Sequence, residues 1–298
     1  MPVATILSTI DELEKNASLY KEKCFDARAD AVDIIEFGII EQIETLLQKN
    51  IQTNELILLK HRSEKLKATL EKIDIHLFKK MRENIWSGKC RGTAFRNMVN
   101  EYVGLNLNGH NEEAGYDNLD LFINGLLPLH ALPQQTKELE PEMVYYQKTP
   151  ARIVFELNER CNFTKQDVFV DLGSGLGQIA ILVNLLSGVT AKGIEFEPAF
   201  CEYAKACAAE LNLPDITFIN TDARQADYSE GTVFFMFTPF KGVIMQEVLA
   251  LLKKESIQRK ITVITYGPCT TQVALQKWLY LGKPKTDSIY APAIFNSL

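Results

Sequence analysis

The hydrophobic positions of the first hundred residues recur at the spacing of helix turns. Thr9 followed by Glu12 has the spacing of a capping box and predicts a helix start near residue 9. Two apolar stripes, separated by a polar break at residues 48–54, each fall largely on one side of a helix: Ala31, Ile34, Ile35, Ile39, Ile43, Leu46 and Leu47, then Leu59, Leu66, Leu70, Ile73, Leu77, Met81 and Ile85. This pattern predicts a helical bundle whose stripes form its core.

A polar connector follows this helical region. Residues 104–142 carry Gly, Asn, Pro and Glu around a single apolar island, "LDLFINGLLPL" at 119–129. We expect one small helix in this connector.

The pattern changes from about Arg152 onward. Short runs rich in β-branched and aromatic residues alternate with longer helical patterns, and the runs cover 168–172, 189–195, 216–220, 232–237 and 261–266. Strands that alternate with helices predict an α/β fold, a Rossmann-like, doubly wound and mostly parallel sheet. We therefore expect an all-α helical domain and connector over residues 1–135 and a Rossmann-like domain over residues 136–298.

Composition limits the functional classes. The chain has 298 residues, 46% of them apolar and 23% charged, and no apolar run reaches the roughly 20 residues that a membrane helix needs. These features favour a cytoplasmic protein without membrane contact. Six Cys and four His lack the spacing of metal ligands, so no metal site is expected.

The charge is acidic overall but basic in one segment. A net charge of −6 argues against a protein that coats nucleic acid, whereas residues 60–96 hold eleven Lys and Arg against four acids. This segment could face phosphates or an acidic partner, although a solvated helix face is more common.

The stretch "VFVDLGSGLGQ", residues 168–178, holds the chemically most specific pattern. Gly173, Gly175 and Gly177 allow the backbone to turn sharply after a strand and to lie close to a ligand. A dinucleotide fingerprint would need glycine or alanine where Gln178 stands, and Asp171 would repel a pyrophosphate. A cationic ligand without phosphate, such as S-adenosylmethionine, fits this loop better.

Two further acids follow the next two predicted strands. Glu195 lies about 20 residues after the glycine loop, where an acid meets ribose hydroxyls in nucleotide-binding folds. Asp222 follows the third strand, where a carboxylate can accept a hydrogen bond from an adenine amino group. Three acids at successive strand ends beside a glycine loop predict one nucleoside site.

At these residues the chain resembles the class I S-adenosylmethionine-dependent methyltransferases, and among them the non-SET histone-lysine methyltransferases of the disruptor-of-telomeric-silencing family. The resemblance covers roughly residues 145–240, from "YYQKTPARIV" to "FFMFTPF". It implies S-adenosylmethionine as cofactor. It also implies cofactor contacts for Tyr145, Thr149, Asp171, Gly173, Ser174, Gly175, Gln178, Glu195, Phe196, Asp222 and Ala223, and catalytic roles for Tyr146, Thr238 and Phe240.

The chain departs from the family pattern at two places. Ala223 stands where the family has an aromatic residue, so ring stacking on the adenine is absent or comes from elsewhere. Phe237 stands where amino-group methyltransferases that act on bases carry Asp or Asn, although Thr238, Pro239 and Phe240 keep the turn and the aromatic wall.

Three functional hypotheses follow. The chain is expected to be a methyltransferase that acts on an amine, such as a lysine side chain of a protein, or on a small molecule. A nucleic-acid methyltransferase is the second hypothesis, which the basic segment favours and the net charge opposes. A cofactor-binding module without catalysis is the third.

Overall fold

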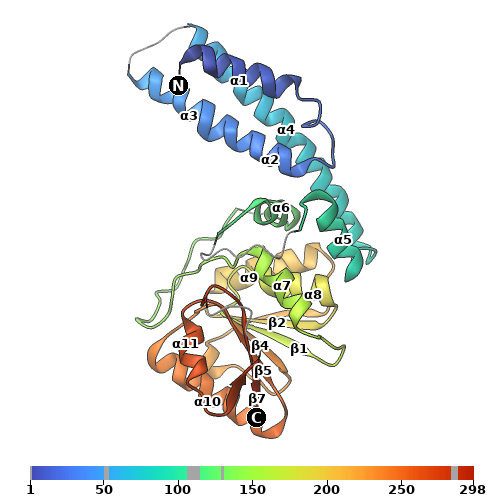
Figure 1. Cartoon of the computed structure of the whole chain (residues 1–298). Helices are drawn as coiled ribbons and strands as arrows, with labels where there is room; N and C mark the ends of the chain where they lie inside the picture. Colours follow the sequence, from blue (N-terminus) through green and yellow to red (C-terminus); the bar gives the residue numbers. More distant parts are fainter. Residues whose placement is uncertain (1, 50–53, 106–114, 129–130, 283–287) are drawn as a thin grey trace. The chain divides into compact units, whose positions relative to one another are not determined.

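The computed structural model of the chain describes residues 2–49, 54–105, 115–128, 131–282 and 288–298 (Figure 1). The chain divides into two compact units. Unit 1 comprises residues 1–83, 97–105 and 117–126, and unit 2 comprises residues 84–96, 106–116 and 127–298. The domain boundary at residue 135 stays a prediction.

Unit 1 is built from helices. They are α1 (Val3–Lys15), α2 (Phe25–Asp33), the π-helix η1 (Ile34–Ile40), α3 (Glu41–Gln48), most of α4 (Asn54–Trp86), the end of α5 (Thr93–Tyr102) and α6 (Asn118–Leu126). Helix α6 is the small helix expected in the connector. Both predicted stripes contribute to buried cores, for example through Ile35 and Ile39 in the first and Leu66 and Leu70 in the second.

Two details of the helical prediction are wrong. Helix α1 begins at Val3, so Thr9 lies inside it, and its hydroxyl donates to the carbonyl of Thr5 instead of capping a helix start. Ile34 is 45% exposed, because the wider π-helical turn that begins there changes the phase of the apolar stripe. Residues 50–53 of the predicted polar break lie outside the described residues.

Unit 2 contains a seven-stranded sheet in the order β3-β2-β1-β4-β5-β7-β6. The five predicted strands form and pair in parallel: β1 (Val168–Leu172), β2 (Thr190–Glu195), β3 (Ile216–Asn220), β4 (Val233–Met236) and β5 (Thr262–Thr265). Strands β6 (Leu279–Leu281) and β7 (Ala293–Ser297) were not predicted, and β7 lies antiparallel to both β5 and β6. The sheet is therefore mixed, with a parallel majority.

The helices of unit 2 are α7 (Ala151–Arg160), α8 (Gln178–Ser187), α9 (Pro198–Glu210), the short 3-10 helix η2 (Ala223–Gln225), α10 (Gly242–Gln258) and α11 (Cys269–Ala274). Helices α8 and α9 pack against β2 (Figure 1). Within the described ranges, no helix has both the length and the apolar character needed to cross a membrane.

Candidate cofactor and acceptor site

One cavity of unit 2 lies at the carboxyl ends of the central parallel strands, where ligands of open α/β sheets bind. Its space, including the open mouth, is about 1010 Å³. Thirteen of the fourteen predicted site residues line this cavity: Tyr145, Tyr146, Thr149, Asp171, Gly173, Ser174, Gln178, Glu195, Phe196, Asp222, Ala223, Thr238 and Phe240. The fourteenth, Gly175, lies beside the cavity and donates its backbone N–H to Glu195 Oε2 at 2.7 Å.

The glycine loop is held by the neighbouring strand. The backbone N–H groups of Gly173 and Ser174 both donate to the carbonyl of Ile194, at 2.9 and 3.0 Å. Gly173 and Gly175 have φ angles of +76° and +52°, which L-residues with a side chain rarely adopt. The strand-to-helix turn therefore depends on glycine at these positions.

The missing Cβ atoms of the loop make room for protein atoms. A Cβ on Gly173 would lie 2.4 Å from Pro239 Cβ, and a Cβ on Gly175 would lie 2.2 Å from the ring of Tyr146. A Cβ on Gly177 would collide with the ring of Phe218. In these directions the absent side chains therefore make room for side chains from distant segments, and the approach of the loop backbone to a ligand stays a prediction.

Buried polar atoms line the cavity beside the loop. Asp171 Oδ2, Ser174 Oγ and Gln178 Oε1 have no hydrogen-bond partner among the described residues. Gln178 is fixed by its other side-chain atom, because Nε2 donates to the carbonyl of Thr149 at 3.0 Å. Burial, and next the nearby charge of Glu195, raise the pKa of Asp171 to about 8. These atoms suit the ammonium and carboxylate groups of the cofactor's amino-acid end, because each needs a partner that the chain does not supply.

Glu195 is a second buried acid at the cavity. Its Oε1 accepts from the backbone N–H of Glu197 at 2.8 Å, and its Oε2 accepts from Gly175. Burial raises the pKa of Glu195. Each carboxylate oxygen keeps a second lone pair, so Glu195 can still accept from a hydroxyl group.

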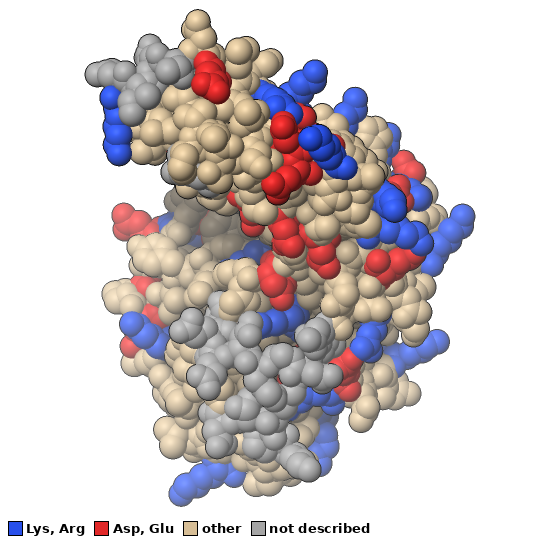
Figure 2. Space-filling model, turned by 45° about the horizontal axis from the view of Figure 1, so that its top comes forward, with Lys and Arg blue, Asp and Glu red and all other residues tan. Residues whose placement is uncertain are grey.

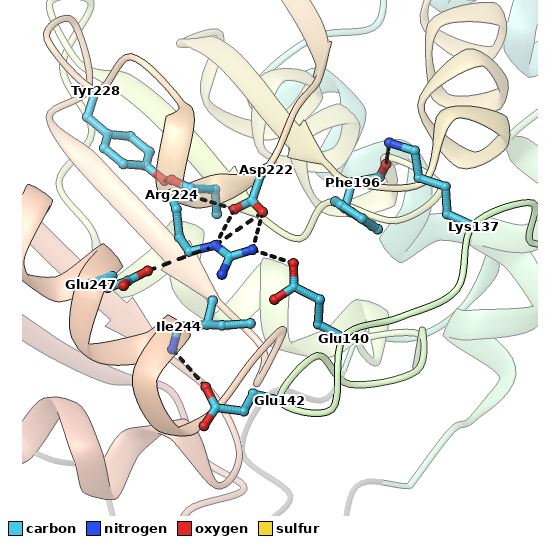
Figure 3. A network of polar contacts seen from close by, with 10 residues as sticks. Lys137, Glu140, Glu142, Phe196, Asp222, Arg224, Tyr228, Ile244 and Glu247 are labelled. Carbon is cyan, nitrogen blue, oxygen red and sulfur yellow. Dashed lines mark hydrogen bonds and ion pairs between the residues drawn. The ribbon is translucent and has the colours of Figure 1, made fainter.

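Asp222 has a partner that the sequence did not reveal. Arg224 donates its backbone N–H and Nε to Asp222 Oδ1, at 2.8 and 3.0 Å, and its Nη2 to Oδ2 at 2.6 Å (Figure 3). These hydrogen bonds lower the pKa of Asp222. The carboxylate is therefore held charged and oriented at the cavity, and its contact with an adenine group stays a prediction.

Phe196, which follows Glu195 in the sequence, is an aromatic residue at the cavity. Lys137 Nζ lies 4.4 Å from the centre of the Phe196 ring and 3.3 Å from the Phe196 carbonyl oxygen (Figure 3). Phe196 lines the cavity together with Ala223. It can therefore offer an aromatic surface near the place where the family's aromatic residue is missing.

A tight turn, residues 237–240, forms another wall of the cavity, and we name it the acceptor turn. Thr238 has a φ angle of +41°, a strained conformation for a β-branched residue. Its N–H donates to Cys269 Sγ, and its Oγ1 accepts from the Cys269 N–H at 3.2 Å. Phe237 packs on Tyr266, with ring centres 4.9 Å apart. These contacts support the turn, which presents aromatic and proline surfaces to the cavity.

Several lining residues were missed by the sequence analysis. Gln135, Met143, Glu197, Phe200, Phe235 and Ile244 also line the cavity. Most are apolar residues that the pattern assigned to core or connector, so their place is set by the tertiary fold. Within the described ranges, no group of three or more potential metal ligands is found.

Several basic residues of the segment 60–96 form ion pairs within unit 1. Lys60 lies 2.7 Å from Glu44, Arg62 lies 2.6 Å from Asp11, and Lys67 pairs with Glu36. Blue and red side chains lie next to each other across the face seen in Figure 2. Pairing of this kind reduces the positive field that phosphate binding would require.

Part of unit 2 is similar to a known protein family. Residues 138–234 match the family model described as histone methylation protein DOT1. A comparison with curated proteins gives no match. The matched range contains Asp171, Glu195 and Asp222 and ends before the acceptor turn.

Solved methyltransferase structures resemble about half of the chain. An RNA methyltransferase from Salinibacter ruber, in complex with S-adenosyl-L-homocysteine, is 24% identical over 51% of this chain and 92% of its own, with a TM-score of 0.41. A precorrin-6y C5,15-methyltransferase from Geobacter metallireducens is 14% identical over 52% and 92%, with a TM-score of 0.38. A ribosomal protein L11 methylase from Lactobacillus delbrueckii is 16% identical over 53% and 83%, with a TM-score of 0.38.

The glycine loop, the buried acids at the strand ends and the family match agree with one another. We therefore identify the C-terminal part of this chain as a class I S-adenosylmethionine-dependent methyltransferase domain with a Rossmann-like fold, in which residues 138–234 are similar to the histone methylation family DOT1.

Proposed function

We propose that the protein transfers a methyl group from S-adenosylmethionine to an amine, and that this amine is a lysine side chain of a protein. The acceptor turn carries the proposal, because Phe237, Pro239 and Phe240 give it an apolar wall and no carboxylate or amide side chain. The match to a histone methylation family supports a protein acceptor.

An apolar wall has a chemical use in this reaction. Only a neutral amine has the lone pair that attacks a methyl carbon, and an apolar surrounding lowers the pKa of an amine by disfavouring its charged form. Phe240 is buried in the wall. The wall therefore helps an amine to reach the site uncharged and keeps water away.

We assign the cofactor contacts as follows. Asp171, Ser174 and Gln178 hold the amino-acid end of the cofactor, Glu195 the ribose and Asp222 the adenine. Tyr145, Thr149, Gly173, Gly175, Phe196 and Ala223 complete the surface against it. When bound, S-adenosylmethionine supplies a methyl group that its sulfonium has already activated.

The remaining residues orient the acceptor. Burial, and next the charge of Asp171, raise the pKa of Tyr146, so its hydroxyl stays protonated at neutral pH. Tyr146 can therefore donate a hydrogen bond but cannot act as a base. Thr238 Oγ1 accepts one hydrogen bond, from the Cys269 N–H, and keeps a second lone pair. This lone pair, or a backbone carbonyl of the acceptor turn, orients the amine nitrogen.

Methyl-labelled cofactor tests the acceptor class. Incubated with cell extract and the protein, it should put label into protease-sensitive material, and hydrolysis of the labelled protein should release methylated lysine. Label in nuclease-sensitive material that falls steeply with salt would instead show a nucleic-acid acceptor. Binding of S-adenosylhomocysteine without any labelled product would show a module without catalysis. The cytoplasm as the place of this reaction stays a prediction from the sequence.

A further inference from the structure

A segment of unit 2 crosses the cavity, and we name residues 135–146 the strap. Its first part is fixed by Glu197, the residue before helix α9. Glu197 Oε2 accepts from the backbone N–H groups of Thr136 and Lys137, at 2.9 and 2.8 Å, and Oε1 accepts from Thr136 Oγ1 at 2.5 Å. Burial would raise the pKa of Glu197, but these hydrogen bonds outweigh it and lower the pKa to about 2.

The other part of the strap pairs with the acceptor turn. The N–H of Val144 donates to the carbonyl of Pro239 at 3.0 Å, and the N–H of Lys241 donates to the carbonyl of Glu142 at 2.9 Å. Met143 and Phe240 form an antiparallel bridge between these two hydrogen bonds. The strap and the turn are therefore joined by backbone hydrogen bonds.

A side chain strengthens this join. Glu142 Oε2 accepts from the backbone N–H of Ile244 at 2.9 Å, in the first turn of α10 (Figure 3). Hydrogen bonds from the N–H groups of Ile244 and Val243 lower the pKa of Glu142, so it is charged at neutral pH. Lys241, at the N-cap position of α10, makes no side-chain cap. Glu142 thus caps a helix that begins a hundred residues later in the chain.

The chain leaves room for this carboxylate. Gly242 has a φ angle of +56°, and a Cβ there would lie 2.0 Å from Glu142 Oε1. A residue with a side chain at position 242 would therefore push the carboxylate away from the helix.

Both sides of this contact belong to the cavity. Met143, Val144, Tyr145 and Tyr146 line it from the strap, and Pro239 and Ile244 line it from the acceptor turn and α10. Pro239 in turn lies against Gly173 of the glycine loop. A shift between strap and turn would therefore change the cofactor end and the acceptor end together.

We propose that Glu142 is a positioning residue for methyl transfer, whose carboxylate fixes the strap to the acceptor turn through the first turn of α10. The proposal rests on the methyltransferase activity and does not depend on which amine is the acceptor. Because a fixed strap retains the bound molecule, loss of the carboxylate should speed release of the product.

The test compares release of S-adenosylhomocysteine from four full-length proteins by stopped flow. Glu142→Ala should release it about tenfold faster than the parent, the factor expected for loss of one charge-assisted contact. Glu142→Gln should stay within about threefold, because the amide oxygen still accepts from Ile244. Glu138→Ala is the control, since Glu138 lies exposed on the same strap without a hydrogen bond or ion pair to any described residue.

Hydrogen exchange and a second variant separate positioning from mere stability. In Glu142→Ala, the amides of residues 142–144 and of 243–244 should both exchange faster. Gly242→Ala should reproduce the faster release even where Glu142→Ala folds poorly. One outcome would overturn the proposal: Glu142→Ala exchanges faster at the amides of 243–244 alone and releases S-adenosylhomocysteine at the rate of Glu138→Ala. Glu142 would then act only as a helix cap. None of these measurements uses an acceptor, so they stand even if the acceptor is not lysine.

Discussion

Asp171 shows at the scale of one residue how the fold prepares the site for a cation. The carboxyl group is buried at the end of β1, and its pKa of about 8 means that it is mostly protonated at neutral pH. An ammonium group beside it would favour the charged form. Binding should therefore remove a proton from Asp171.

This coupling gives the first prediction. Affinity for S-adenosylhomocysteine should rise as pH rises from about 6 to about 8, because less work is then needed to ionise Asp171. Calorimetry at pH 7 in buffers of different ionisation enthalpy should show release of nearly one proton. Asp171→Asn should bind weakly and release none from this position. Equal heats in all buffers for the parent protein would contradict the assignment.

Glu195 gives the second prediction. Glu195→Ala should weaken S-adenosylhomocysteine by about 1.5–3 kcal/mol, the usual range for a hydrogen bond to a charged group. The structure adds an indirect part to this loss, because Gly175 and Glu197 lose their acceptor. Titration calorimetry measures the effect. Glu202→Ala, on the exposed side of α9, is the matched control and should bind like the parent. Unchanged affinity in Glu195→Ala would make Glu195 a structural acid only.

At the scale of elements, helix α4 shows that three basic residues of the segment 60–96 differ in their contacts. Arg82 Nη1 donates to the carbonyl of Gly125 at 2.8 Å, and Lys80 lies 3.0 Å from Glu22, whereas Lys79 makes no ion pair with any described residue. Reversal of all three charges would therefore mix a loss of stability with a loss of surface charge.

The third prediction separates these effects. Arg82→Glu should lower the melting temperature by several degrees, since it breaks a contact to the end of α6 and leaves a carbonyl without its donor. Lys79→Glu should leave the melting temperature within about one degree of the parent. If the segment docks an acidic protein, Lys79→Glu should also raise KM without changing kcat. Equal melting temperatures for both variants would show that the Arg82 contact contributes nothing to stability.

The elements that could be predicted are those whose pattern is local. The five parallel strands and helix α8 carry strong runs and a clear glycine signal, so their places followed from the sequence. Strand β6 has only three residues, and the partners of β6 and β7 are set by the tertiary fold rather than by any local period. The Thr9 capping box failed because a helix can begin without a side-chain cap, as α1 does after Pro2.

The site residues also divide into those that could be predicted from the sequence and those that could not. Asp171, Glu195 and Asp222 could be found because each ends a strand beside the glycine loop. Glu197 and Glu142 act through contacts between segments 60 and 102 residues apart, and no spacing in the sequence reports such contacts. Arg224 lies only two residues after Asp222, but no pattern in the sequence marked it as a partner of that acid.

At the scale of the whole molecule, unit 2 includes a segment, residues 84–96, that lies between two parts of unit 1 in the sequence. Arg91 Nη1 donates to Asn184 Oδ1 at 3.0 Å, and the N–H of Gly92 donates to the carbonyl of Leu185 at 2.8 Å. Phe95 stacks on Phe155, with ring centres 6.4 Å apart. Residues 84–96 are therefore part of the methyltransferase unit.

The fourth prediction concerns two fragments. Residues 84–298 contain all residues that line the cavity, and residues 136–298 contain all of them except Gln135. Only the first fragment keeps the contacts of Arg91, Gly92 and Phe95. The longer fragment should melt roughly 5 °C or more above the shorter one, because the shorter one exposes Phe155 and leaves Asn184 without a donor. Thermal melts with and without S-adenosylhomocysteine measure this. Equal melting temperatures would show that residues 84–96 do not stabilise the unit.

The hydrogen bonds between Thr238 and Cys269 bear on the order in which the parts of the site form during synthesis of the chain. Every residue that lines the cavity lies between positions 135 and 244, whereas the partner of the strained turn comes later, after β5. On a ribosome, the cofactor end can therefore form while the acceptor turn still lacks its support. We therefore expect a nascent chain to gain the ability to hold its nucleoside before it gains the ability to methylate.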